Sequence, residues 1–360
     1  MKTKNYLWAM LAATTLSLAA CGSEENENTE QPQKMEARFE LTLKGTTVNT
    51  RSTGADLPSA DNEKTIGRVA VAIFDKDGKV IIIQEFTQTA GIIVNCTPGE
   101  NCTGIVVANA PEGHFKGVGT KANFIAKTTD LTQTATELPM SGEIKSGTED
   151  AATTTFTLQA GKTSTLSAKV SRLVARVAIT SIKTNFDAAG QYADATFKAK
   201  KIFMHNANTK STVNPSNPTG SVPLSGKTDG TNPGLQNSLD RVIDATAFTS
   251  PYWFYTFAHD ATTPTKLVIY GEFDPDGTGS AAAESVYYPV VVNKSQAGTS
   301  IGGDSGTDST IQPNSTYTIT ATIKGKGVDD PDKDIDPAIV NLTVKVAGWA
   351  LNITQDVDFN

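Results

Sequence analysis

Short segments in which apolar and polar residues alternate recur along this chain, and they restrict the folds open to it. In Thr316–Lys324, the apolar residues alternate with a row of threonines. Side chains at alternating positions lie on opposite faces of a β-strand. Comparable segments are Ala37–Leu43, Arg68–Phe74, Lys79–Phe86, Gly91–Cys96, Cys102–Asn109, Thr153–Leu158, Ser164–Ser171, Leu173–Thr180, Ala195–Met204, Lys266–Phe273, Ser285–Asn293 and Ala338–Val346. A mostly β fold with two β-sandwich-like domains in tandem and few short helices is predicted.

Leu173–Thr180 is the strongest of these strands, and we place the domain boundary just before it, near Ser171. Its β-branched residues favour a strand over the alternative of a helix. An N-terminal domain then covers residues 52–171 and a C-terminal domain residues 172–360. A single helix of the N-terminal domain is predicted between Lys121 and Gln133.

Two hairpins are predicted in the N-terminal domain. The Asp77-Gly78 step supplies the positive φ that a tight turn needs, so the strands on either side of it should pair. Gly91–Cys96 and Cys102–Asn109 should form the second hairpin. A lone close cysteine pair in an exported chain favours a disulfide over a metal site. We therefore predict a structural Cys96–Cys102 disulfide across that turn.

The first 20 residues have the pattern of a secretion signal. Two lysines precede Tyr6–Ala20, a short apolar core rich in Leu and Ala. This core is too short to serve comfortably as a spanning helix. It ends in Leu18-Ala19-Ala20-Cys21, which resembles the lipobox of bacterial lipoproteins, where the Cys is acylated and the bond before it is then cut. Lipidation of Cys21 is predicted; the alternative is an ordinary signal peptide with an incidental Cys.

A tether, a strand and a peptide bond that follows an arginine come after Cys21, in that order. Gly22–Glu36 is acidic, and Ala37–Leu43 places its apolar residues on one face of a strand. A polar loop then exposes the bond Arg51-Ser52. This order indicates a subunit that is delivered to a membrane and later released by proteolysis, with residues 21–51 as a lipidated propeptide whose first strand is removable.

Charge and composition narrow the partners and cofactors. The net charge is −7 and no basic stripe is evident, so the counterion release that drives nucleic-acid binding has no source. Nucleic acid is therefore excluded as a partner. The three histidines are far in sequence from Cys96 and Cys102, which gives a four-ligand zinc site little support.

Four further motifs are interpreted as structural. Gly303–Gly306 is similar to the nucleophile loop of trypsin-like proteases but lacks recognisable partners for a triad. Asp274–Gly277 and Asp329–Asp334 lack the ligand spacing of an EF-hand. The aromatic run Tyr252–Phe257 offers a carbohydrate platform or, more simply, core packing. We expect no catalytic residue, no cofactor and no metal.

Six short segments, taken in order, carry a family resemblance. They are Phe39–Lys44 followed by Arg51, Arg68–Phe74, Ile105–Ala110, Ser171–Val177, Tyr287–Asn293 and Val344–Trp349. Their order and spacing resemble the Bacteroidales fimbrillin family, the FimA-like major subunits of type V pili, over nearly the full length after the leader. The Cys96/Cys102 pair does not map onto the family pattern.

The resemblance implies transthyretin-like domains and a mechanism of assembly. It implies an outer-membrane lipoprotein precursor that an arginine-specific protease cuts between Arg51 and Ser52. Loss of the first strand, Ala37–Lys44, then opens a groove in the N-terminal domain, which donor strands of another subunit fill. In this chain the donor strands lie at residues 340–360. Their candidate plugs are Leu342, Val344, Val346, Trp349, Leu351 and Ile353.

The partners implied in this way are other copies of the chain, accessory fimbrial subunits and the protease, with the mature form in extracellular fimbriae that support adhesion. Two alternatives remain. A fimbrial tip or accessory adhesin would have a C-terminus that does not donate. A surface lipoprotein that binds glycans through Tyr252–Phe257 would stay monomeric after cleavage.

Overall fold

A computed structural model describes residues 35–45, 62–147, 153–214, 223–226, 239–243, 248, 251–259, 262–279, 283–294, 300–302, 309–335 and 340–348, with only the backbone described at 45, 300–302 and 341–348. From Glu36 onward these residues belong to one compact unit. Strands dominate, with one short α-helix and two 3-10 turns among the described residues. The predicted class, mostly β with few short helices, is confirmed.

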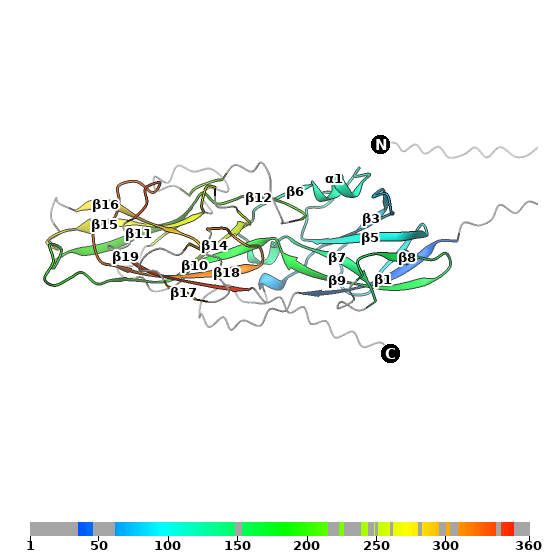
Figure 1. The fold of residues 1–360 in the computed structure, drawn as a ribbon, viewed down its shortest axis with the longest axis horizontal. Helices are drawn as coiled ribbons and strands as arrows, with labels where there is room; N and C mark the ends of the chain where they lie inside the picture. Colours follow the sequence, from blue (N-terminus) through cyan, green and yellow to red (C-terminus); the bar gives the residue numbers. More distant parts are fainter. Residues whose placement is uncertain are drawn as a thin grey trace, which may run out of the picture. The chain divides into compact units, whose positions relative to one another are not determined.

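An eight-stranded sheet contains the described strands up to Arg172, apart from β6 (Figure 1). Its order is β3-β2-β5-β7-β9-β1-β4, and β8 pairs with β5 beside that path. The strands are β1 (Ala37–Gly45), β2 (Val69–Phe74), β3 (Val80–Phe86), β4 (Ile92–Cys96), β5 (Gly99–Ala108), β7 (Met140–Ser146), β8 (Phe156–Leu158) and β9 (Thr163–Arg172).

Apart from β12 (Lys210–Thr212), the described strands from Val174 onward form two more sheets, of order β14-β10-β18-β19-β17 and β13-β11-β15-β16. The first comprises β10 (Val174–Thr184), β14 (Tyr252–Phe257), β17 (Ser300–Gly302), β18 (Ser315–Ile323) and β19 (Val340–Gly348). The second comprises β11 (Thr196–His205), β13 (Asp240–Val242), β15 (Lys266–Asp274) and β16 (Glu284–Val291). Sheet membership thus changes between Arg172 and Val174, next to the boundary predicted at Ser171, although the division into two domains stays a prediction.

The helix predicted between Lys121 and Gln133 is wrong in its length. The helix α1 covers Lys121–Ile125, and the Thr120 side chain caps its start by accepting a hydrogen bond from Asn123 N. The chain then becomes β6 (Thr128–Asp130), which pairs with β12 (Lys210–Thr212). The β-branched Thr128 and Thr129 therefore pair with a distant strand, and this pairing overrides the local helical pattern. The two 3-10 turns are η1 (Asn62–Lys64) and η2 (Ala135–Glu137).

One predicted hairpin is confirmed and the other is wrong. Strands β2 and β3 pair around a turn in which Gly78 has φ 76° and the Asp75 carboxylate accepts from Asp77 N and Lys79 N. Strands β4 and β5 do not pair in the described structure: β4 pairs with β1, while β5 pairs with β2, β7 and β8. The apolar face of β4 joins the sheet through β1, a partner that lies much earlier in the sequence.

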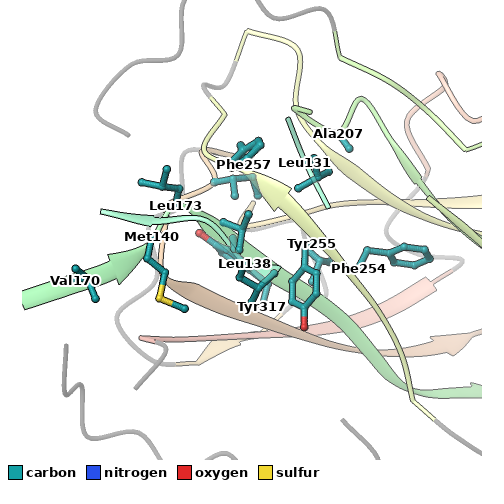
Figure 2. Packing of buried hydrophobic residues seen from close by; sticks show 14 of the residues in the cluster. Leu131, Leu138, Met140, Val170, Leu173, Ala207, Phe254, Tyr255, Phe257 and Tyr317 are labelled. Carbon is teal, nitrogen blue, oxygen red and sulfur yellow. The ribbon is translucent and has the colours of Figure 1, made fainter. Parts of the chain in front are cut away.

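A continuous apolar core connects the eight-stranded sheet to the later sheets. Figure 2 shows part of it, where Leu138 and Met140 lie with Leu173, Tyr255 and Tyr317. All five side chains are almost fully buried. Among the described residues, no helix is long and apolar enough to cross a membrane.

Candidate functional site: the slot of the first strand

Strand β1 lies between two neighbours that are both far from it in sequence (Figure 1). It runs parallel to β9, with Arg38 to Gly45 registered against Thr163 to Val170. On its other side it runs antiparallel to β4, with Ala37 opposite Cys96 and Leu41 opposite Ile92. Both backbone edges of β1 are therefore paired.

The two faces of β1 differ sharply in exposure. Phe39 is 0% exposed, and Leu41 and Leu43 are 3% and 6% exposed. The side chains between them point away from the core and are exposed. The apolar face predicted from the sequence, which comprises Ala37, Phe39, Leu41 and Leu43, is confirmed as part of the core.

The place that β1 occupies, which we call the β1 slot, has an apolar lining. It is bounded by β4 and β9, whose core-facing side chains are Ile92, Val94, Cys96, Leu166, Ala168 and Val170. All of these belong to the same core cluster as the β1 side chains. Without β1, the backbone edges of β4 and β9 and the apolar lining between them would face water. Such an open site is a strong template for another strand.

Cys96 lies in the β1 slot, directly opposite Ala37. Both Cys96 and Cys102 are buried and free in this structure, so the disulfide predicted between them is not formed here. The hairpin across which the disulfide was placed is also not formed, because β4 and β5 are not paired neighbours in the sheet. Burial, followed by the nearby Cys102 and the Glu36 carboxylate, raises the pKa of the Cys96 thiol to about 11.

Two predicted processing sites lie outside the described residues. Cys21 belongs to the leader region, and Arg51 and Ser52 fall in segment 46–61, between the last described residue of β1 and η1. The lipidation and cleavage sites therefore remain predictions. Any cut in segment 46–61 would separate β1 from the rest of the chain.

The chain after segment 46–61 is held by a buried charge cluster, which we call the Glu63 anchor. Glu63 is 1% exposed, and its two carboxylate oxygens each accept from Arg176 Nη1 at 2.8 Å. Tyr255 donates its hydroxyl to Glu63 Oε1 at 2.7 Å. Arg172 Nε donates to the Glu63 carbonyl at 3.1 Å. Nothing in the sequence pattern around Glu63 singled it out, because a lone Glu in a polar stretch usually reads as exposed.

Asn109 holds the next residues of the same segment. Its side-chain oxygen accepts from Gly67 N at 2.9 Å, and its amide donates to the Thr65 and Leu138 carbonyls at 2.9 and 2.8 Å. Asn109 has φ 61°, a backbone conformation that Asn tolerates better than most residues. Residues 63–67 are thus fixed by side chains from several strands before β2 begins.

The predicted donor strand is only partly described. Leu342, Val344 and Val346 lie in β19, which pairs antiparallel with β18 from Val340 to Gly348 and parallel with β17 at Thr343 to Lys345. The other candidates, Trp349, Leu351 and Ile353, lie outside the described residues. In this structure β19 therefore belongs to the five-stranded sheet of the same subunit.

The aromatic run Tyr252–Phe257 forms β14, and most of it belongs to the core. Phe254, Tyr255 and Phe257 are fully buried, while Tyr252 and Trp253 are half-buried. The predicted core role is confirmed for the buried rings. Two half-buried rings remain for a carbohydrate platform.

The two acidic loops form hydrogen bonds with other groups of the chain. The Asp274 carboxylate accepts from the Asp276 and Gly279 backbone N–H groups, which makes a local turn. The carbonyls of Pro331 and Asp332 accept from the buried Lys266 ammonium at 3.3 and 2.8 Å. Within the described part of the chain, no group of three or more His, Cys, Asp or Glu could hold a metal ion. Gly303–Gly306 lies outside the described residues.

Comparison with known proteins gives the fold a family context. Residues 37–172 match the family model of the major fimbrial subunit protein FimA. A fimbrilin (FimA) from Porphyromonas gingivalis is 22% identical and superposes with a TM-score of 0.64 over 89% of this chain and 99% of that chain. A candidate cell adhesion protein from Parabacteroides distasonis is 18% identical, with a TM-score of 0.65 over 89% and 99%. Another from Bacteroides eggerthii is 21% identical, with a TM-score of 0.63 over 88% and 96%.

The family match covers the region that contains β1 and all the strands that surround it. At these identities the structural matches establish a shared fold and leave function to be argued from the site. Residues 37–172 are therefore similar to the FimA major fimbrial subunit family, and the chain has the fold of a fimbrillin, as its sequence resemblance predicts.

Proposed function

We propose that this chain is a structural, non-enzymatic subunit of a fimbrium that polymerises by strand exchange at the β1 slot. The observation that carries the proposal is the position of β1, paired on both edges, buried on its apolar face, and joined to the rest of the subunit through a segment that contains Arg51. The FimA family match over residues 37–172 supports the same function.

In this proposal the leader and the anchor deliver the precursor. Cys21 is acylated and the precursor is held at the outer membrane, because two or more acyl chains give stable attachment where one gives marginal attachment. An arginine-specific protease cuts after Arg51, and β1 is released together with the lipid anchor. The subunit thereby loses its membrane attachment and opens its slot in a single step.

The C-terminus contains a segment with the same pattern of side chains as β1. Ala37, Phe39, Leu41 and Leu43 have counterparts of similar type, at the same spacing, in Ala347, Trp349, Leu351 and Ile353. Laid in the direction of β1, residues 347–353 put a small residue opposite Cys96 and an aromatic ring in the place of Phe39. We therefore propose that this segment of a second copy fills the slot, parallel to β9, after its Ala347 and Gly348 have left their pairing with the start of β18.

The energetics favour such an exchange. Each large apolar side chain that enters the slot is worth about 1.5–3 kcal/mol, and the inserted backbone satisfies both open strand edges. One subunit gives its C-terminus and accepts at its β1 slot, so the contact is heterologous and need not close into a ring. Repetition then builds a filament of copies of this chain, to which accessory subunits would be added through the same contact.

The test compares precursor Gly22–Asn360 with an Arg51→Ala variant. Both are incubated with an arginine-specific protease and inspected by electron microscopy. The precursor should form filaments and Arg51→Ala should not, while Arg38→Ala, which removes an exposed arginine of β1, should assemble like the parent. Filaments from uncut Arg51→Ala would overturn the mechanism, and a clean cut that leaves a stable monomer would favour a tip adhesin or a glycan-binding lipoprotein.

A further inference from the structure

We infer that Glu63 is the positioning residue that keeps the new N-terminal segment on the subunit when β1 leaves. The inference rests on the proposed function, because it concerns the product of a cut in segment 46–61. A cut after Arg51 produces a new chain end at Ser52, ten residues before η1 begins at Asn62. The contacts of the first described residues after that end decide whether they stay folded when β1 leaves.

The partners of Glu63 lie away from the slot. Arg176 belongs to β10 and Tyr255 to β14, and these two strands are paired neighbours in the five-stranded sheet. Strands β10 and β14 make no ladder with β1 or β4 among the described residues. Opening the slot therefore removes none of the bonds that the Glu63 carboxylate makes to Arg176 and Tyr255.

Arg172 links the anchor to the strand that borders the slot. It lies at the end of β9, just past Val170, the last residue of β9 that pairs with β1. Its Nε donates to the Glu63 carbonyl and its Nη1 to Asn314 Oδ1 at 3.4 Å. Once β1 is gone, this contact should hold the C-terminal end of β9, so that the loss of pairing along its freed edge stops at Arg172.

Burial of the charges makes the Glu63 anchor resistant to opening. Glu63, Arg172 and Arg176 are 1%, 1% and 4% exposed, so their charges depend on one another for stabilisation. Removing the carboxylate would leave two guanidinium groups in the core without their common anion. Residues 62–67 should therefore stay in place even though the strand before them has been removed.

Hydrogen exchange measured by mass spectrometry tests the inference on the cut subunit after size exclusion has removed the β1 peptide. Peptides from β4 and from Thr163–Val170 should exchange at least about tenfold faster than in the uncut precursor, because they lose their ladder bonds. Peptides that cover 62–68 and 172–178 should keep the precursor's rates within about twofold.

Two matched variants separate the Glu63 anchor from general loss of packing. Tyr255 and Tyr288 are both fully buried tyrosines that donate one hydroxyl hydrogen bond, to Glu63 and to the Gly325 carbonyl respectively. Tyr255→Phe should speed exchange at 62–68 by about tenfold in the cut subunit. Tyr288→Phe should leave 62–68 unchanged.

Equal speeding of exchange at 62–68 and at β4 in the cut parent would overturn the inference, as would equal effects of the two variants at 62–68. The parent comparison needs no variant to fold. A site for an unrelated sequence-specific protease, placed within 46–51, produces the same new end when Arg51 is not cut. The fate of the Glu63 anchor can therefore be decided even if the proposed maturation at Arg51 fails.

Discussion

The first and the last described strands each lie between one parallel and one antiparallel neighbour, but the lengths of those neighbours differ. Strand β1 lies between parallel β9 and antiparallel β4, and β19 lies between parallel β17 and antiparallel β18. The neighbours of β1 belong to a continuous eight-stranded sheet, whereas β17 is a three-residue strand that covers only Thr343 to Lys345 of β19. The β1 slot is thus bounded by a strand of the same sheet on each side, while most of β19 has a single described partner.

This difference supports the opposite roles proposed for the two ends of the chain. A slot with two open edges and an apolar floor needs a strand to fill it, so the β1 region is suited to accept. A strand whose outer neighbour covers only three of its residues can continue into another subunit at lower cost to its own fold, so the C-terminal region is suited to donate. The following predictions test that division of roles.

Truncation after Gly348 should have the largest effect, because it removes the three apolar residues Trp349, Leu351 and Ile353 from the donor. Their burial in the slot is worth about 4.5–9 kcal/mol in total, more than a thousandfold in affinity. Cut subunits should then form no filaments in electron microscopy. Filaments of normal length would show that the donor lies elsewhere.

Phe39→Ala should destabilise the uncut precursor and leave the assembled filaments unchanged. The ring is fully buried, so its loss should destabilise the uncut precursor by about 3–5 kcal/mol in urea unfolding. Thr42→Ala, on the exposed face of β1, should cost at most about 0.5 kcal/mol. Filaments assembled from cut Phe39→Ala protein should melt at the parental temperature, because β1 is absent from them. A lowered filament melting temperature would show that β1 stays in the assembled subunit.

Cys96 should report whether the slot is filled. Burial, Cys102 and Glu36 raise its pKa from 9.0 to about 11, so the neutral thiol is favoured in the precursor. Iodoacetamide at pH 8.5 should label it slowly in the precursor, faster after β1 is removed, and slowly again in filaments. Mass spectrometry of the Cys96 peptide follows the three states, and equal rates in all of them would contradict a slot that opens and refills.

The same pKa sets a modest dependence of stability on pH. A thiol whose pKa is raised by folding contributes stability that is present below the unfolded value of 9.0 and is lost as the pH rises toward about 11. Precursor stability in urea should therefore fall across that window. Cys96→Ala should reduce the fall, and an unchanged slope would mean that other groups cause it.

Local patterns predicted the strands well and their partners poorly. The alternation in Ala37–Leu43 and in Thr316–Lys324 identified the buried faces of β1 and β18 correctly. The hairpin proposed between β4 and β5 was wrong because β4 pairs with β1, a contact that no turn signal encodes. Glu63 was missed because its burial depends on Arg172, Arg176 and Tyr255, which lie more than a hundred residues later.

The most direct test of the exchange is a cross-link that uses Cys96 of one subunit. In the proposed register, residue 347 of the donor occupies the place of Ala37, directly opposite Cys96, where facing side chains are close enough for a disulfide. Ala347→Cys and Gly348→Cys are compared after cleavage and mild oxidation on a non-reducing gel. Ala347→Cys alone should give a ladder of covalent oligomers, which Arg51→Ala should abolish. Equal ladders from both variants, or a ladder without cleavage, would contradict strand exchange in this register.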